Sequence, residues 1–186
     1  DYDEWWQARD ARRALKRISS AILLVGGTFD AEDPYGAWEA YRTLKEYNPE
    51  LDCRLVVGPW THGAWRGNGD ANRLGEVEFS EESLSQFYRD EVEFPFFEQH
   101  LRDVGQGGAS ATGALVFFTG ENCWREMDEW NTEESKEQRI YLTEDGSLQS
   151  QVSELKNSYS SYISDPLAPV PYYPDITSRR KSDYLI

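Results

Sequence analysis

Two side chains that often act together in proton transfer, Asp30 and His62, each follow a short apolar run that ends in glycine. A carboxylate that accepts a hydrogen bond from histidine Nδ1–H fixes the imidazole tautomer and stabilises the imidazolium formed when Nε2 takes a proton. The order, acid and then histidine, is that of a Ser-His-Asp triad whose nucleophile comes earlier in the chain. On pattern alone, a turn-capping aspartate and a structural histidine remain the alternative.

The elements around this pair form a strand, a helix and a second strand. The first run, residues 21–25, is continuous, which is typical of a strand buried on both faces of a parallel sheet, and the second, residues 53–57, is apolar apart from Arg54. Between them, Asp33-Pro34 predicts the start of a helix and Asn48-Pro49 predicts its end. A right-handed crossover brings the carboxyl ends of both strands to one edge of the sheet, where open α/β sheets bind ligands. We therefore predict an α/β fold that places the two candidate residues side by side.

Two more helices are expected around this unit. Residues 2–18 carry apolar positions at three-to-four spacing between charged ones, which predicts one amphipathic helix. After a Gly/Asn-rich loop at residues 63–75, Ser80 begins a helix with an apolar stripe that reaches Leu101. Pro95 lies inside this helix and is expected to kink or interrupt it.

The sequence changes character after the second of these helices. We predict an α/β portion at residues 1–104, a flexible Gly-rich linker at 105–113 and an incomplete β domain at 114–186. Residues 165–174 are rich in proline and are not expected to form a central strand. The short β-rich runs beyond the linker are residues 114–119, 139–143 and 158–163.

Composition limits the classes of partner. The 186 residues, 39% of them hydrophobic, suffice for one good-sized domain or two incomplete ones. A net charge of −15 argues against binding to nucleic acid. The longest apolar stretch, residues 21–27, is far below the roughly 20 residues that cross a bilayer, so no membrane span is expected. Cys53 and Cys123 lack metal-ligand spacing and decide neither compartment nor metal. Because the chain starts at Asp1 rather than Met, we expect a piece of a longer protein.

The predicted strands end in two sequence motifs, Gly-Gly-x-aromatic-Asp at Asp30 and Gly-Pro-Trp-x-His at His62. These motifs resemble the α/β-hydrolase family of α-amino-acid ester hydrolases, glutaryl 7-aminocephalosporanic acid acylases, bacterial cocaine esterases and Xaa-Pro dipeptidyl peptidases. The ester hydrolase and acylase branch is the most similar, through residues 29–33 and Tyr35-Gly36. The matching segments are Val25-Gly26-Gly27-Thr28-Phe29-Asp30-Ala31-Glu32-Asp33, Val57-Gly58-Pro59-Trp60-Thr61-His62-Gly63, Phe117-Phe118-Thr119-Gly120-Glu121-Asn122-x-Trp124-Arg125 with Trp130, and Ser164-Asp165-Pro166 with Pro169-Val170-Pro171-Tyr172.

The resemblance implies the C-terminal part of an α/β-hydrolase domain followed by part of a jelly-roll-like β-sandwich domain. It implies hydrolysis of a small-molecule ester or amide, or of a peptide, with His62 as general base and then general acid and Asp30 orienting it. It implies no cofactor and no nucleic-acid or membrane partner, and it is compatible with a homo-oligomer. It also favours a periplasmic or secreted location over the cytoplasm.

The chain departs from the family pattern in two places. Thr28 stands where many members have tryptophan. No Gly-x-Ser-x-Gly elbow is present, and Ser110 lies among glycines without a strand before it or a helix after it. We therefore expect the nucleophile upstream and no activity from these residues alone. Two alternatives stay open: an Xaa-Pro dipeptidyl peptidase, and a non-catalytic binding module that uses the β domain.

The other polar residues near the pair have structural interpretations. Asp33 is expected to cap the helix, and Glu32 to be an acid of its first turn. Together with Asp30 and His62 they include enough metal-ligand atoms, but the spacing does not enforce a converging geometry, so no metal site is predicted. His100 is expected to be an ordinary helix histidine.

Several aromatic residues have two interpretations each. Trp60 and Trp65 bracket His62 and either form a wall of an acyl pocket or pack beneath the loop. Trp124, Arg125 and Trp130 suggest a sugar-binding platform, although core or inter-domain contacts are the favoured interpretation.

Overall fold

The computed structural model describes residues 2–67, 71–102, 113–130, 136–155, 157, 159 and 161–169. The chain divides into two compact units, with the described residues up to Trp130 in the first and those from residue 136 onward in the second. Within the described residues, none of the helices has the length and apolar character needed to cross a membrane.

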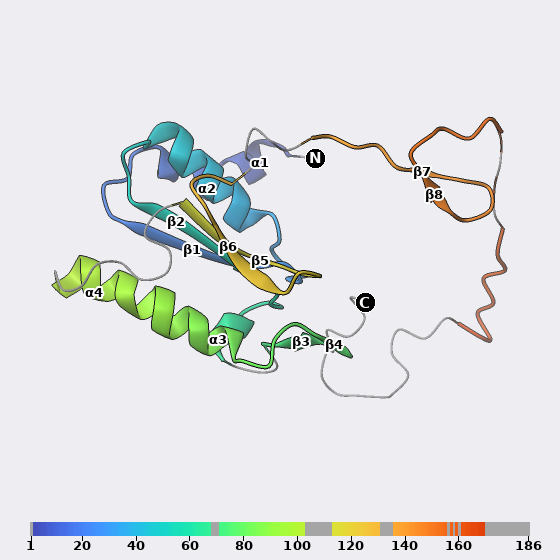
Figure 1. Ribbon diagram of the computed structural model, residues 1–186. Coiled ribbons are helices and arrows are strands. Elements are labelled where there is room, and N and C mark those ends of the chain that lie inside the picture. Colours follow the sequence, from blue (N-terminus) through green and yellow to red (C-terminus); the bar gives the residue numbers. More distant parts are fainter. Residues whose placement is uncertain are drawn as a thin grey trace. The chain divides into compact units, whose positions relative to one another are not determined.

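The first unit is built on a four-stranded sheet in the order β1-β2-β5-β6 (Figure 1). Strands β1, β2 and β5 are parallel, and β6 is antiparallel to β5. The register of β1 and β2 pairs Gly27 with Gly58, so both predicted strands end at the same level. The strands are β1 Ile22–Gly27, β2 Cys53–Gly58, β5 Gly113–Phe118 and β6 Cys123–Met127.

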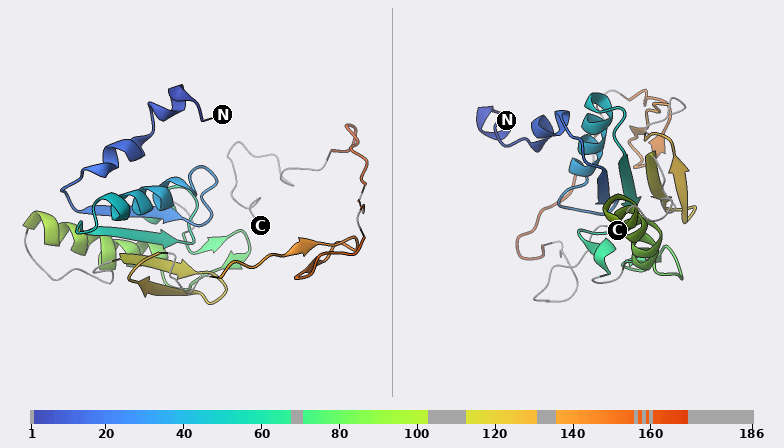
Figure 2. Two further views of the ribbon diagram at one scale, coloured as in Figure 1. Left: turned by 90° about the horizontal axis from the view of Figure 1, so that it is seen from above. Right: turned by 90° about the vertical axis from the view of Figure 1, so that its left-hand side faces the viewer.

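Helices cover both faces of this sheet (Figures 1 and 2). Tyr41 and Leu44 of α2 pack with Leu55 and Val57 of β2 on one face. Val56 points to the opposite face, which is covered by the helical segments α3, η3 and α4. Every residue of β2 is buried, as expected for a central parallel strand. The helical segments are α2 Gly36–Tyr47, η2 Ala64–Arg66, α3 Leu84–Phe87, η3 Tyr88–Glu93 and α4 Phe94–Arg102, and a short hairpin joins β3 Arg73–Leu74 to β4 Val77–Glu78.

The prediction of one continuous helix over residues 2–18 is wrong. The structure has a short helix α1, Glu4–Gln7, and a separate 3-10 helix η1, Ala11–Lys16. Asp10 separates them because it has extended backbone angles and its carboxylate accepts the backbone N–H of Arg12. An aspartate that caps a following turn competes with continuation of the preceding helix.

The predicted helix with an apolar stripe from Leu84 to Leu101 is present, but it changes geometry before its proline. Ser83 rather than Ser80 caps it, by accepting the backbone N–H of Gln86. Residues Tyr88–Glu93 form a π-helix, and the α-helix resumes at Phe94. Pro95 has no N–H to donate, and the wider π-turn before it lets the helix pass the proline.

The predicted domain boundary also differs from the structure. Residues 114–119 were expected to open the β domain, yet Gly113–Phe118 forms β5, which pairs in parallel with β2. Its continuous apolar run is buried and lies between β2 and β6, so β5 is an inner strand of the sheet, as β2 is. The division between units therefore follows Trp130. The rest of the predicted linker, residues 105–112, lies outside the described residues.

The described part of the second unit contains one short hairpin. It joins β7, Tyr141–Leu142, to β8, Leu148–Gln149, and Gly146 in its turn has a positive φ of 80°. The run at residues 139–143 thus contains a strand, whereas described residues 159 and 161–163 do not form one. Residues 158, 160 and 170–174 lie outside the described set. The jelly-roll domain stays a prediction.

Candidate functional site

The ends of β1 and β2 are joined by backbone hydrogen bonds that continue past both strands. The N–H of Thr28 donates to the carbonyl of Gly58, and that of Phe29 donates to the carbonyl of Trp60. A Cβ on Gly27 would overlap the Trp60 carbonyl, and one on Gly58 would overlap the Trp60 indole. The glycines that end the two strands therefore let the loops bearing the candidate residues meet.

Asp30 is held at this junction by three hydrogen bonds. Its Oδ1 accepts the backbone N–H groups of Glu32 and Asp33 at 2.9 and 3.1 Å, and its Oδ2 lies 2.9 Å from Nδ1 of His62. Its side chain is only 3% exposed. Burial raises the pKa of Asp30, but the two N–H donors and His62 together outweigh it, so the pKa lies below its usual value. Asp30 is therefore a fixed carboxylate at neutral pH.

His62 presents the opposite combination of properties. Its side chain is 57% exposed, and among the described residues Asp30 is its one hydrogen-bond partner. The hydrogen bond to Asp30, followed by the charges of Asp30 and Glu32, raises the pKa of His62. Because Nδ1 faces the carboxylate, Nε2 is the atom that can exchange a proton with another group. The predicted pair is thus in contact, and the carboxylate of Asp30 orients the imidazole of His62.

Asp33 interacts with the start of α2, although the helix begins at Gly36 and its N-cap residue is Tyr35 rather than the expected Asp33. Asp33 Oδ1 accepts the N–H of Gly36 at 2.7 Å at the start of α2. Glu32 lies near enough to His62 to affect its pKa. No group of three or more His, Cys, Asp or Glu side chains able to hold a metal ion occurs within the described residues.

The two tryptophans that bracket His62 have different environments. Trp60 is fully buried and packs against Trp65, Tyr88 and Trp124, with ring centroids 5.7 to 6.2 Å apart. It therefore packs beneath the loop in this chain and does not form a pocket wall. Trp65 is half-buried, and its ring centroid lies 6.5 Å from that of His62.

The proposed sugar platform does not form one surface in the structure. Trp124 packs into the core against Phe87 and Phe117. Trp130 instead contacts Trp38 of α2, with ring centroids 4.3 Å apart. Core packing, the favoured interpretation, accounts for Trp124.

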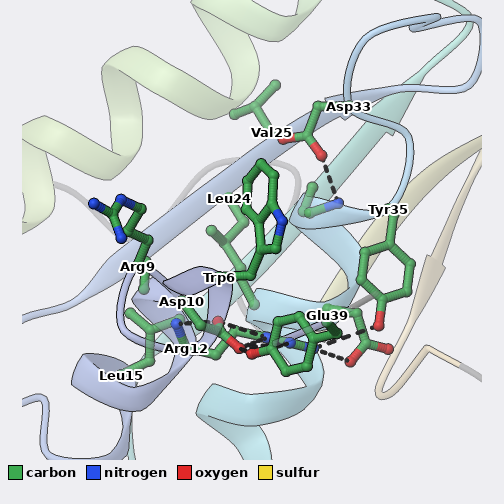
Figure 3. A pocket seen from close by; sticks show the side chains of 15 residues that line it. Trp6, Arg9, Asp10, Arg12, Leu15, Leu24, Val25, Asp33, Tyr35 and Glu39 are labelled. Carbon is green, nitrogen blue, oxygen red and sulfur yellow. Dashed lines mark hydrogen bonds and ion pairs between the residues drawn. The ribbon is translucent and has the colours of Figure 1, made fainter. Parts of the chain in front are cut away.

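A cavity of about 610 Å³ lies where the N-terminal segment meets β1 and α2 (Figure 3). Trp6, Leu24 and Tyr35 give it a largely apolar lining, and Asp33 lies at its border. The sequence did not predict this cavity, because its lining comes from separate segments of the chain whose contact no local pattern indicates. Neither His62 nor Asp30 lines it.

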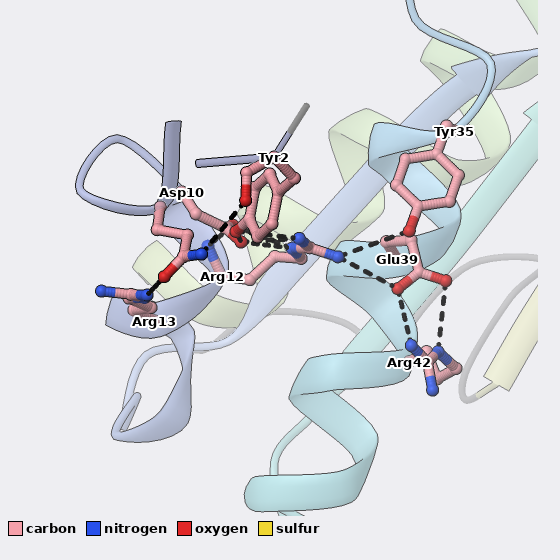
Figure 4. A network of polar contacts seen from close by, with 8 residues as sticks. Tyr2, Asp10, Arg12, Arg13, Tyr35, Glu39 and Arg42 are labelled. Atoms are coloured by element: carbon pink, nitrogen blue, oxygen red, sulfur yellow. Dashed lines mark hydrogen bonds and ion pairs between the residues drawn. The ribbon is translucent and has the colours of Figure 1, made fainter. Parts of the chain in front are cut away.

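A network of charged side chains ties the N-terminal segment to α2 beside this cavity (Figure 4). Arg12 donates to Asp10 and reaches Glu39 at 3.4 Å, and Glu39 also pairs with Arg42. The hydrogen bonds from Arg12 and Tyr2 hold the pKa of Asp10 well below its usual range. The carboxylates of this network are occupied by ion pairs with Arg12 and Arg42, and the pairing of Arg12 with Glu39 ties the N-terminal segment to α2, so we interpret the network as structural.

A second aspartate–histidine contact, absent from the predictions, lies at the other end of β2. Asp52 receives two hydrogen bonds from Arg54, at 2.9 and 2.7 Å, and lies 3.0 Å from Nε2 of His100 on α4. Gln99 Oε1 accepts a further hydrogen bond from Arg54. Arg54 is 2% exposed, which is unusual for a cation and explains why its partners surround it. An arginine inside a predicted buried strand was the signal available in the sequence.

Comparison with known proteins relates the chain to one group of hydrolases. The sequence model of the X-Pro dipeptidyl-peptidase (S15 family) matches residues 1–64, which include Asp30 and His62. The cocaine esterase of Rhodococcus sp. (strain MB1 Bresler) is 25% identical over 181 residues, which are 92% of this chain and 30% of that protein. The expected resemblance to this hydrolase group is confirmed.

A solved structure extends this likeness to three dimensions. The crystal structure of an aminopeptidase from the marine sediment archaeon Thaumarchaeota archaeon superimposes with a TM-score of 0.81 at 33% identity. The match covers 99% of this chain and 31% of that one. The chain therefore spans less than a third of the length of either relative. The α/β part of the predicted fold, with its parallel strands, is also confirmed.

Proposed function

We propose that this chain is the acid- and base-bearing part of a serine hydrolase that cleaves an ester or amide bond. The observation that carries the proposal is the hydrogen bond between buried Asp30 and exposed His62. Asp30 orients the imidazole, and Nε2 of His62 takes the proton of a serine hydroxyl during attack on the carbonyl carbon. His62 then gives that proton to the leaving group, and water releases the acyl group by the same route.

The serine and the oxyanion donors of the proposed enzyme come from chain outside these 186 residues. The proposal of a hydrolase is supported by the three similarities reported above. The names of the matched family and of the two proteins each describe an esterase or a peptidase. The 186 residues alone are expected to be inactive, because their sequence contains no Gly-x-Ser-x-Gly elbow that would carry the nucleophile.

The test is hydrolysis by the full-length protein, compared between two histidine variants. We expect His62→Ala to reduce kcat at least 10³-fold, because the reaction loses its general base. His100→Ala, which removes a histidine of similar contact distance to an aspartate, should keep kcat within a few-fold. Equal activity of the His62 variant and the wild type would contradict the proposal.

A peptidase is the second candidate, and the higher identity with the aminopeptidase favours it over a simple esterase. The assay therefore compares four substrates: a p-nitrophenyl ester, an α-amino-acid ester, an aminoacyl anilide and an Xaa-Pro anilide. The highest kcat/KM identifies the substrate class. A non-catalytic binding module predicts no turnover of any of them, together with glycine or alanine at the position of the upstream serine.

A further inference from the structure

Within the described residues, the imidazole of His62 has few contacts that fix its orientation. More than half of its side chain is exposed, and within the described part of the chain its hydrogen bonding is limited to Asp30. One hydrogen bond does not fix a ring that can rotate about two side-chain bonds. A catalytic base needs closer control, because a displacement of about 1 Å reduces the rate about 100-fold. A second contact from within these residues would limit the rotation of this ring.

Trp65 supplies a second contact to the ring. Its indole meets the imidazole edge to face, with ring centroids 6.5 Å apart and planes at 67°. This geometry lies within the range of favourable aromatic pairs. Trp65 reaches this place because Gly63 turns the chain with a φ of 73° and starts the short helix η2. The tryptophan thus approaches the imidazole from the same loop.

Trp65 is itself held by the core. It packs against Trp60 with ring centroids 6.2 Å apart, and Trp60 is fully buried between Tyr88 and Trp124. A series of ring contacts therefore leads from the aromatic core to the imidazole. Trp60 cannot move without disturbing that core. Because Trp65 packs against Trp60, the Trp65 ring has a defined position next to His62.

We propose that Trp65 is a positioning residue for His62: its indole, held by Trp60, keeps the imidazole in the orientation in which Nδ1–H meets Asp30. The inference rests on the proposed hydrolase function, and it assigns Trp65 a role in kcat rather than in substrate binding. In this proposal Trp65 acts through its ring contact with His62, so its effect on the reaction passes through the base.

The kinetic test replaces the indole and leaves the rest of the loop unchanged. In the full-length protein, Trp65→Leu removes the ring, Trp65→Phe retains an aromatic ring, and Trp5→Leu is the control at an exposed tryptophan. We expect Trp65→Leu to reduce kcat about 10- to 100-fold with KM within about two-fold, and Trp65→Phe to restore most of kcat. Trp5→Leu should match the wild type. A rise in KM with unchanged kcat would show a substrate wall and overturn the inference.

A second measurement does not depend on activity. Histidine labelled with ¹³C at Cε1 gives one NMR signal for His62, identified by its loss in His62→Gln, and its titration gives the pKa. The charged groups that influence His62 are Asp30, Glu32 and Arg66. A loosened ring forms a poorer hydrogen bond to Asp30, so Trp65→Leu should lower the pKa of His62, and Trp65→Phe less so.

The two measurements separate failure of this inference from failure of the proposed function. If Trp65→Leu leaves both kcat and the pKa of His62 unchanged, Trp65 has no positioning role, even where His62→Ala abolishes activity. If His62→Ala has no effect on hydrolysis, the proposed function fails, and the pKa of His62 still tests the contact. Thermal unfolding identifies variants that do not fold. Trp65→Gln, which suits a half-exposed position, replaces Trp65→Leu in that case.

Discussion

An aspartate–histidine contact lies near each end of β2, and only the one at the carboxyl end, between Asp30 after β1 and His62 after β2, has the properties expected of the proposed catalytic pair. Asp30 and His62 lie 2.9 Å apart beyond the carboxyl end, and Asp52 and His100 lie 3.0 Å apart before the amino end. The distances are the same within 0.1 Å. The difference therefore lies in the surroundings of each pair.

The surroundings differ in charge and in access. Asp30 accepts hydrogen bonds from two neutral backbone N–H groups, so His62 is its one partner that can carry a positive charge among the described residues. The charge of Asp52 is instead balanced by Arg54, which donates two hydrogen bonds to it. His100 faces Asp52 through Nε2, an atom that is buried and not aligned for a hydrogen bond, while the His62 side chain is 57% exposed and faces Asp30 through Nδ1. A histidine can exchange a proton through its second ring nitrogen only where that nitrogen is accessible.

The largest expected effect tests the two aspartates directly. Asp30→Asn should reduce kcat of the full-length protein about 10³- to 10⁴-fold, because an amide cannot orient the imidazole with the correct tautomer or stabilise the imidazolium. Asp52→Asn is the matched control and should change kcat less than about three-fold. Steady-state kinetics on the preferred substrate measures both. A loss of similar size in the two variants would mean that the ends of β2 do not differ in the way described.

Removing the buried cation tests the structural pair. Arg54→Met leaves Asp52 and Gln99 without their main partner, and the free energy of unfolding should fall by about 2 kcal/mol, since Asp52 is partly exposed and water compensates in part. Urea unfolding at pH 7 measures the change. Arg42→Met is the control, because the Arg42 side chain is 69% exposed and Glu39 retains Arg12 as a partner, so the loss of this ion pair should cost little. Equal loss in both variants would show that the Arg54 cluster is not a buried ion pair.

The sequence predicts one end of β2 better than the other for a physical reason. The strand, helix and strand around Asp30 and His62 follow from local signals: two apolar runs, an aspartate before proline, and glycines where the loops meet. A strand–helix–strand unit also has few ways to pack, so order alone brings the two loops together. Their contact is therefore predictable, while their catalytic role stays a prediction.

The cluster at the amino end depends on contacts over long sequence distances. Arg54 donates to Gln99, which is 45 residues away, and pairs in register with Gly113 of β5. No local sequence pattern predicts that residues 113–118 pair with β2 after the Gly-rich segment. For this reason β5 was expected to belong to another domain. The break in the N-terminal helix was missed for a different reason, because Asp10 favours a cap where the apolar period favours continuation.

The smallest expected effect concerns pH. The contribution of the Asp30–His62 pair to folding stability should be largest at the pH values at which the enzyme is least active. The pKa of His62 is raised, so its contribution to stability is present below the ordinary value of 6.5 and is lost as pH rises through the folded-state pKa. The pKa of Asp30 is lowered, so its contribution is present above 3.8 and is lost as pH falls through the folded-state pKa. Both contributions are complete between these two values.

Activity has the opposite dependence on His62, because a protonated Nε2 cannot take the serine proton. We expect kcat/KM to fall as pH decreases through a pKa above 6.5, and Asp52→Asn to leave that pKa unchanged. For stability, the difference in unfolding free energy between wild type and His62→Gln should be larger at pH 5 than at pH 9. Urea unfolding at the two pH values measures it, and His100→Gln is the control. A difference that does not change with pH would mean that Asp30 does not favour the charged form of His62.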